Sequence, residues 1–333
     1  MTASTADPRS PIGLVLGSHM SPRDIIPLAR LAEELGFGEL WFSEDCWFSG
    51  GMAGAAAALG ATTTLPLGLG IVAASTRHPS LTAMEIATLD GMFPGRVYGG
   101  IGHGVPHWLD QMGLRPDKPM TALRQALDTV RRLLDGGTVS EDGHFHFDDI
   151  TLTHPAPTRV PLYTGVVGER GLRMSGEVAD GTVLSTLSSP AYVRWARDHI
   201  TAGAEAAGRT EPHRLVTYAL YSVASDSKVA KQALREAIAP HIAAIPDSAL
   251  GQVFGIQDEL TEMLKAGGPE AVARDMPDEW LDGLAVSGDP EECAELLRQR
   301  LDAGSDSVGL WLFPADRADE VARLTAKEVL PRL

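Results

Sequence analysis

Residues 11–36, PIGLVLGSHMSPRDIIPLARLAEELG, contain the unit from which the rest of the chain is built. The apolar run Ile12 to Leu16 predicts a buried strand. Ser21-Pro22 is typical of a helix start, with a capping serine before a proline. Apolar residues then recur at helical spacing as far as Gly36, which predicts the end of the helix. The stretch is therefore a strand, a turn and an amphipathic helix.

The same unit recurs along the chain. Seven further apolar runs predict strands: Glu39 to Ser43, Leu67 to Ala73, Val97 to Ile101, Leu162 to Gly165, Gly181 to Leu184, Leu215 to Val223 and Val308 to Phe313. Strands that alternate with helices predict an α/β fold. A closed (β/α)₈ barrel, or TIM barrel, fits eight such units better than the main alternative, a Rossmann-like open sheet with an appended helical region.

Two segments depart from the repeat. Residues 138–152 predict a hairpin excursion, because short apolar pairs flank a glycine. Residues 226–286 are alanine-rich, without a clear strand, and predict a helical insertion before the last strand. We expect residues 1–333 to form a single domain.

The composition disfavours several classes of function. With 28 basic and 44 acidic residues the net charge is −16. Such a surface repels phosphate backbones, so we expect no nucleic-acid partner. No apolar run approaches the roughly 18 residues that span a membrane, and the polar start of the chain lacks the apolar core of a secretory signal. The two distant cysteines, Cys46 and Cys293, suggest a reduced, cytoplasmic chain.

The loops at the carboxyl ends of barrel strands usually hold the active site, so catalytic residues are expected there. Glu44 and Asp45 follow the second strand; as adjacent carboxylates they could act as general acids, or they could cap the next helix. His103 lies between two glycines after the fourth strand, which favours a role in a site. His19, after the first strand, is open to either a site role or a packing role.

The loop after the fifth strand is glycine-rich and leads directly into a helix. Its backbone N–H groups and the helix dipole could hold a phosphate, with Arg170 or Arg173 adding charge; alternatively, the glycines only form a tight turn. His144, His146 and His154 lie on or near the predicted hairpin without supporting cysteines, so we expect no metal site there.

Several motifs together resemble the luciferase-like monooxygenase superfamily. They are Leu69-Gly70-Ile71-Val72, Arg77-His78-Pro79, Ala87-Thr88-Leu89-Asp90, Pro94-Gly95-Arg96-Val97 and Gly100-Ile101-Gly102-His103-Gly104. Further on, Pro161 to Gly165 and the run Gly176 to Gly181 are most similar to the methylenetetrahydromethanopterin reductase-like branch, which depends on coenzyme F420. The resemblance covers most of residues 11–225.

The resemblance implies a barrel with an insertion before the last strand, often as a homodimer. It also implies a cofactor at the rim: coenzyme F420, a deazaflavin that exchanges hydride, or reduced flavin mononucleotide (FMN) with oxygen. In deazaflavin members a non-prolyl cis peptide forms a bulge behind the ring, which here would fall near Ile71, Val72 and Ala73. The phosphate-binding turn maps onto Gly165 and Gly168. The implied cofactor contacts are Ser43, Ile71, Val72, Ala73, Gly102, Gly104, Gly165, Val166, Gly168, Glu169 and Arg170.

The chain departs from that pattern at its acids. The acidic position after the second strand maps onto Glu44, but the histidine that often follows it is Asp45 here. No glutamate occurs in the first strand, where reductases of this branch commonly carry one, and Val105 stands where some relatives have an acid. A proton donor would have to come from Glu44, Asp45, His19 or His103.

Three hypotheses on function follow. The main one is an F420-dependent oxidoreductase that transfers a hydride between the deazaflavin C5 and a small organic substrate. The second is an FMN-dependent monooxygenase that uses molecular oxygen and a separate cofactor reductase. The third is a barrel that binds a flavin-like ligand without catalysis. Because the chain is acidic and the F420 tail is anionic, the first requires local basic groups such as Arg77, Arg170 and Arg173.

Overall fold

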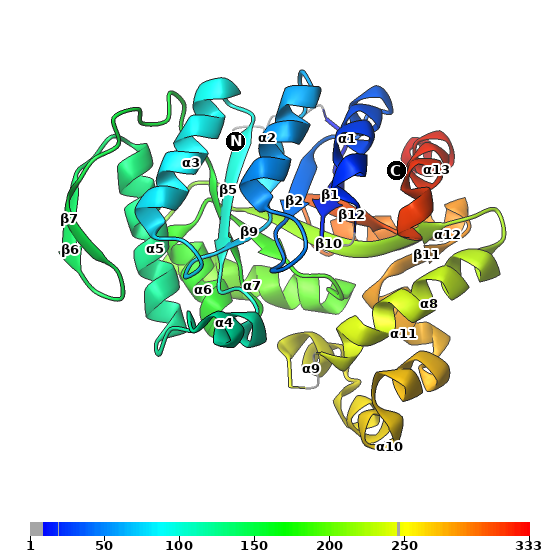
Figure 1. The fold of residues 1–333 in the computed structure, drawn as a ribbon. Helices are drawn as coiled ribbons and strands as arrows, with labels where there is room; N and C mark the ends of the chain where they lie inside the picture. The colour runs from blue at the N-terminus through cyan, green and yellow to red at the C-terminus, as the bar shows by residue number, and fades with distance from the viewer. Residues whose placement is uncertain (1–8, 19, 245–246) are drawn as a thin grey trace.

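The computed structural model describes residues 9–18, 20–244 and 247–333, and its parallel strands close into a barrel (Figure 1). The barrel strands are β1 (Ile12–Gly17), β2 (Leu40–Ser43), β3 (Leu67–Leu69) with β4 (Val72–Ala73), β5 (Val97–Gly102), β8 (Leu162–Gly165), β9 (Gly181–Leu184), β10 (Arg214–Val223) and β12 (Ser307–Leu312). They pair in that order, and β12 pairs with β1. The predicted barrel is confirmed, and its closure rules out an open sheet.

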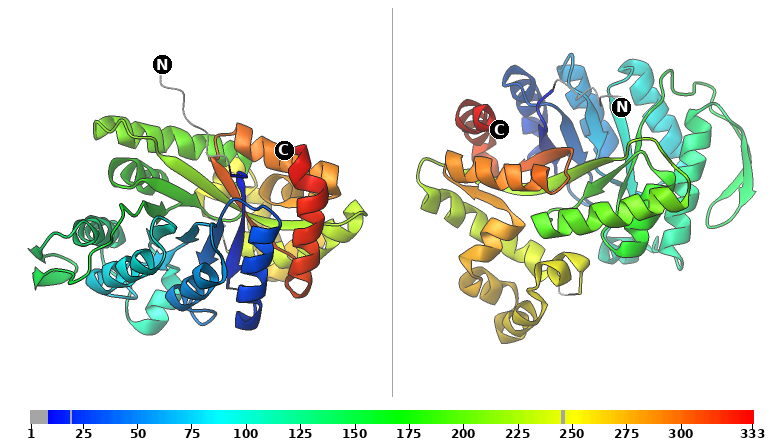
Figure 2. Two further views of the ribbon diagram at one scale, coloured as in Figure 1. Left: turned by 90° about the horizontal axis from the view of Figure 1, so that it is seen from above. Right: turned by 180° about the vertical axis from the view of Figure 1, so that it is seen from behind.

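Helices surround the strands (Figures 1 and 2). Those of the barrel are α1 (Ile25–Glu34), α2 (Gly51–Ala61), α3 (Pro79–Met92), α4 (Pro106–Met112), α5 (Pro119–Leu134), α6 (Glu169–Val178), α7 (Pro190–Ala206), α12 (Pro290–Asp302) and α13 (Ala318–Leu324). Among the described residues, none of the helices is both long and apolar enough to cross a membrane.

The two segments that interrupt the repeat lie on opposite sides of the barrel (Figures 1 and 2). Strands β6 (Val139–Asp142) and β7 (His146–Ile150) form an antiparallel hairpin. The insertion contains α8 (Ser227–Ala243), α9 (Ala249–Phe254), α10 (Gln257–Asp275) and α11 (Asp278–Leu284). It ends in β11 (Val286–Gly288), which pairs with the end of β10. This strand was not predicted, because three residues are too few to show a period.

Two strands also differ in extent from their predictions. The predicted third strand, Leu67 to Ala73, is two short pieces, because the backbone leaves the ladder at Gly70 and Ile71. Glu39 was predicted to begin the second strand but lies just before it and is buried. Its carboxylate accepts hydrogen bonds from Trp41 and Ser307 and pairs with Arg214 at 2.8 Å.

Next to the Glu39–Arg214 ion pair, aromatic rings fill the inside of the barrel. Trp41 is fully buried, and its ring centroid lies 5.2 Å from that of Tyr163, 6.0 Å from Tyr98 and 6.1 Å from Tyr218. A barrel interior packed in this way is a core and not a channel. Chemistry is therefore confined to the two ends of the barrel.

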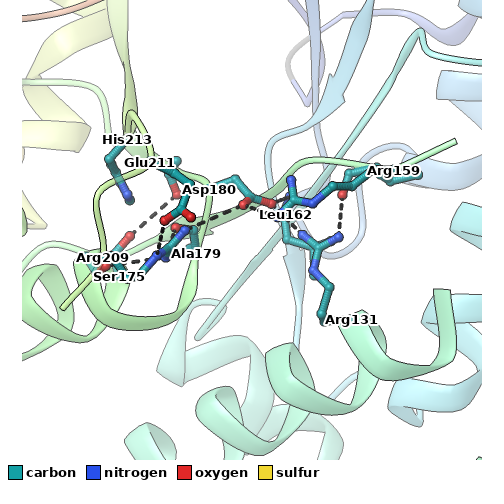
Figure 3. A network of polar contacts seen from close by, with 12 residues as sticks. Arg131, Arg159, Leu162, Ser175, Ala179, Asp180, Arg209, Glu211 and His213 are labelled. Atoms are coloured by element: carbon teal, nitrogen blue, oxygen red, sulfur yellow. Dashed lines mark hydrogen bonds and ion pairs between the residues drawn. The ribbon is translucent and has the colours of Figure 1, made fainter. Parts of the chain in front are cut away.

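At the amino-terminal end of the strands, a polar network surrounds Asp180, which precedes β9 (Figure 3). The carboxylate pairs with Arg131 and with Arg159, and it accepts a hydrogen bond from the Leu162 N–H at 2.8 Å. Burial alone would raise the pKa of Asp180, but these hydrogen bonds and charges outweigh it and hold that pKa below its ordinary value. A network at this end of a barrel stabilises the fold.

Candidate functional site

The candidate site lies at the carboxyl-terminal end of the barrel strands, which we call the rim. The break in the third strand forms the back wall of this site. The break contains a cis peptide between Gly70 and Ile71, at the first of the residues near which it was expected. Tyr218 donates a hydrogen bond from inside the barrel to the Gly70 carbonyl at 3.3 Å. A Cβ on Gly70 would lie 1.7 Å from that hydroxyl oxygen, so only glycine fits there.

Glycines on β5 and β8 let Ile71 pack closely against the barrel. Gly102 and Gly165 are paired in register, and a Cβ on either would come 2.8 or 2.9 Å from the Ile71 side chain. Gly104 has a positive φ of 73°, and a Cβ there would lie 2.7 Å from the Ala73 Cβ. Val72 and Ala73 are themselves buried. Residues 71–73 thus form a wall that is supported from behind by the glycines of β5 and β8.

The loop after β8 continues this surface toward α6. Val166 is buried, and the Val167 carbonyl accepts a hydrogen bond from the Tyr192 hydroxyl at 2.6 Å, so the loop is anchored. Gly168 is the N-cap of α6, and a Cβ at this position would meet open space. A helix start of this kind, with free space beside it, suits a phosphate group.

The basic residues expected near an anionic cofactor are mostly paired already. Arg173 pairs with Glu169 at 3.0 Å. Arg77 makes a two-pronged ion pair with Glu44, at 2.6 and 2.7 Å. For exposed Arg170, the described residues offer no carboxylate partner. Arg170, at the first turn of α6, is therefore the cation that an incoming anion could use.

Glu44 is held on two sides. Besides Arg77, it accepts a hydrogen bond from the Gly51 N–H, at the start of α2, at 2.6 Å. The pair with Glu44 is also the main reason why the pKa of Arg77 is raised. Through Arg77, Glu44 ties the loop after β2 to the loop after β4. Its hydrogen bond with Gly51 is the helix-capping role that the sequence left open. Its catalytic role stays a prediction.

Asp45 faces the end of β1. Its Oδ2 accepts a short hydrogen bond from Ser18 and lies 3.5 Å from the Ser43 hydroxyl, and both serines are buried. The hydroxyl oxygens of Ser18 and Ser43 are also within hydrogen-bond distance of each other, at 2.9 Å. Within the described residues, no hydrogen bond reaches Oδ1. The structure thus brings predicted residues Ser43 and Asp45 together.

The two predicted histidines differ in what can be said of them. His103 follows β5 and is half-buried, and burial lowers its pKa, so the ring is mostly neutral near pH 7. A neutral imidazole there can accept a proton. His19 lies outside the residues that the structure describes, and its role stays a prediction.

Three aromatic side chains line the rim beside these loops. Trp47 and Phe48 follow β2 and are 66% and 59% exposed, although large apolar side chains are usually covered. Phe48 lies 6.4 Å from the ring of Trp108 on α4, and the Trp47 indole donates to Gln111 at 3.2 Å. The rim therefore carries an exposed apolar, aromatic surface beside these loops.

The insertion brings to the rim a further residue that was not predicted. His241, in the last turn of α8, is half-buried, and its ring packs edge-on against Trp311 at 6.2 Å. Trp311 is on β12, inside the barrel. Helix α8 is alanine-rich and contains no recognisable motif. Its sequence therefore does not indicate that its end reaches the barrel.

The motifs that suggested a family mainly hold the barrel together. Asp90 is fully buried and binds the backbone and hydroxyl of Thr158 as well as the Gly95 N–H. Arg96 donates to the carbonyls of Thr62 and Leu65. His78 caps α3 and packs against Phe147 of the hairpin at 4.7 Å. These motifs identify the scaffold better than they identify the chemistry.

Comparisons with known proteins agree with the geometry. The chain is 30% identical to the 5,10-methylenetetrahydromethanopterin reductase of Archaeoglobus fulgidus, over 91% of this chain and 94% of the reductase. It is 28% identical to the F420-dependent glucose-6-phosphate dehydrogenase of Nakamurella multipartita, over 94% of this chain and 93% of the dehydrogenase.

A solved structure shares the fold along nearly its whole length. The coenzyme F420-dependent tetrahydromethanopterin reductase of Methanopyrus kandleri superposes with a TM-score of 0.86 at 26% identity, covering 97% of this chain and 99% of that one. The model of the luciferase-like monooxygenase family matches residues 2–307. The chain therefore belongs to the luciferase-like monooxygenase family.

Proposed function

We propose that the protein is an F420-dependent oxidoreductase that transfers a hydride between the deazaflavin ring and a small organic substrate. The observation that carries the proposal is the interrupted third strand, where Ile71 packs on Gly102 and Gly165 and forms a supported wall at the rim. Relatives at 28–30% identity over more than nine-tenths of this chain include a protein named as an F420-dependent dehydrogenase and a methylenetetrahydromethanopterin reductase.

The residues of the rim suit this cofactor. Ile71, Val72 and Ala73 would support one face of the ring. The free space at Gly168, the first turn of α6 and Arg170 would hold the phosphate. The remaining proposed contacts are Ser43, Gly102, Gly104, Gly165, Val166 and Glu169. When bound, the deazaflavin supplies hydride exchange at C5, and the protein positions the reactants and handles the proton.

Proton handling falls to the side chains on the open side of the wall. We assign it first to Asp45 and His103, because Glu44 is committed to Arg77 and to α2. His19 remains a candidate on its position in the sequence alone. The aromatic surface of Trp47, Phe48 and Trp108 favours a substrate with an apolar or planar part.

The proposal includes a homodimer in the cytoplasm. Helix α2 contains no charged residue, and α3 exposes Leu81, Met84 and Met92 along one face. Apolar helix surfaces of this kind favour contact with another protein surface, here that of a second copy. Cys46 and Cys293 are free thiols, which fits a reducing compartment.

The test is an anaerobic screen of the purified protein with oxidised F420. Alcohols, reduced pterins and sugar phosphates are offered in turn, and loss of the deazaflavin absorbance is followed. We expect at least one class to reduce the cofactor without oxygen. Oxygen uptake and an oxygenated product with reduced FMN would indicate a monooxygenase instead. Binding of F420 without turnover by any class would indicate the silent barrel.

A further inference from the structure

The backbone at Gly70, where the third strand leaves the ladder, is held from two directions. Its N–H donates to the Phe42 carbonyl on β2 at 2.8 Å, and its carbonyl accepts the hydrogen bond from the Tyr218 hydroxyl at 3.3 Å. The pairing of β3 and β4 with β5 skips residues 69–71, so the ladder with β5 does not fix this carbonyl. Tyr218 supplies the contact that the ladder lacks here.

The Tyr218 side chain is itself held in place inside the barrel. It lies on β10, where its register partner is Gly309 of β12, and a Cβ on Gly309 would come 3.1 Å from the Tyr218 ring. The Trp41 ring packs against it edge-on, with the centroids 6.1 Å apart. Burial raises the pKa of Tyr218 well above its ordinary value, so the phenol keeps the proton that it donates. The hydroxyl is therefore a fixed donor beneath the wall of residues 71–73.

Ile71 follows Gly70 directly and is the half-buried residue of that wall. It packs against the same buried cluster that contains Tyr218, and Gly102 and Gly165 leave it no room for a methyl group on either strand. The Gly70 carbonyl and the Ile71 nitrogen belong to one planar peptide group. A change in the direction of the carbonyl therefore moves Ile71 as well.

We infer that Tyr218 is a positioning residue for the cofactor: its hydroxyl fixes the Gly70 carbonyl and so sets the surface that Ile71 presents to the deazaflavin ring. This inference rests on the proposed function. Tyr218 is buried and acts only through the backbone of the wall, so it has no part in the transfer of the hydride or the proton.

The first experiment needs no cofactor. NMR of protein labelled with carbonyl-¹³C glycine and ¹⁵N isoleucine reports only Gly-Ile peptides, of which the chain has three: Gly70-Ile71, Gly100-Ile101 and Gly255-Ile256. Tyr218→Phe removes the hydroxyl and should shift the Gly70 carbonyl resonance, while Gly255 stays in place. The matched control is Tyr221→Phe on the same strand, because that buried hydroxyl accepts a hydrogen bond from Thr325 at 3.0 Å instead. An unmoved Gly70 resonance in Tyr218→Phe would overturn the contact.

The second experiment measures F420 binding and turnover. Tyr218→Phe should weaken F420 binding roughly three- to tenfold, which is the scale of one lost hydrogen bond. The KM for F420 should rise, and the KM for the organic substrate should not change. Tyr221→Phe also loses one hydrogen bond but should bind F420 as the wild type does, which separates positioning from a general loss of stability.

Two results would overturn the positioning role: an F420 affinity in Tyr218→Phe equal to that of the wild type, or an equal loss of affinity in both variants. If the wild type binds no F420, the proposed function and the positioning role fail together. The Gly70 resonance then still decides whether Tyr218 holds the carbonyl, so the two failures are distinguishable.

Discussion

Gly165 and Gly168 lie three residues apart in the loop after β8, yet a methyl group meets different surroundings at each. At Gly165 it would lie 2.9 Å from the Ile71 Cγ2, and at Gly168 it would meet open space. We predict that Gly165→Ala lowers the free energy of unfolding by about 1–3 kcal/mol, as overpacking does. Gly168→Ala should stay within about 0.5 kcal/mol of the wild type. Urea unfolding of both variants checks this, and equal stabilities would contradict the packing of Ile71.

The sequence predicted site residues where a strand end and a loop motif coincide. Asp45, Gly102 and Gly165 all lie on the rim, because βα units put strand ends at one end of the barrel. It could not predict which of the two adjacent carboxylates, Glu44 or Asp45, forms an ion pair. The partner of Glu44 is Arg77, which is 33 residues further along the chain. A local sequence pattern does not show that two residues so far apart in the chain form a contact. His241 was missed for the same reason, since its position depends on how the insertion packs.

Among the elements, α12 has the clearest start signal in the chain. Asp289 accepts hydrogen bonds from the backbones of Glu291 and Glu292, and the Glu292 side chain accepts one from the Asp289 N–H, which completes a capping box. We predict that Asp289→Ala lowers the free energy of unfolding by about 1 kcal/mol. Glu291→Ala is the control, because that side chain is outside the box. Equal losses for the two variants in chemical unfolding would count against the cap.

Elements with strong local signals were predicted well, and elements set by tertiary contacts were not. The Asp289-Pro290 start of α12 and the strands β5, β8 and β9 were anticipated to within one residue. The third strand was predicted as continuous, because its apolar run is unbroken while its break depends on Tyr218 and on two glycines of other strands. Periodicity records which face of a strand is buried, but not which neighbour interrupts it.

For the whole molecule, the network at the amino-terminal end makes an acid-sensitive contribution to stability. The pKa of Asp180 is lowered, so its contribution is complete above its unfolded pKa, near 4, and is lost as the pH falls through the lower folded value. Asp180→Asn should lower the free energy of unfolding by about 2–3 kcal/mol at pH 7, and less below pH 4. The control is Asp148→Asn on the exposed hairpin strand. A loss that does not depend on pH would contradict this assignment.

That unfolding experiment also tests whether the chain is one domain. Residues of the insertion share a core with the barrel, Ile238 and Ile242 with Trp311 among them. We therefore expect residues 1–333 to unfold in a single transition. Two separate transitions would show that the insertion folds by itself.

The proposed dimer is tested on the outer face of α3. Met84 is 48% exposed there, in line with Leu81 and Met92. We predict that Met84→Lys converts a dimer to a monomer in sedimentation velocity, because a lysine charge would be buried in the interface. Val229→Lys, at a 52% exposed position on α8, is the control and should remain dimeric. A wild type that is monomeric at every concentration would contradict the proposal.

The proposed function depends on a deazaflavin bound at the rim. The most direct measurement is a pair of titrations of the purified protein, one with F420 and one with FMN, followed by cofactor fluorescence. We expect saturable binding of F420 at one site per chain and weaker binding of FMN. Arg170→Ala should weaken F420 binding by about tenfold, since one charge-assisted contact is lost. Tight binding of FMN with no binding of F420 would contradict the proposed function.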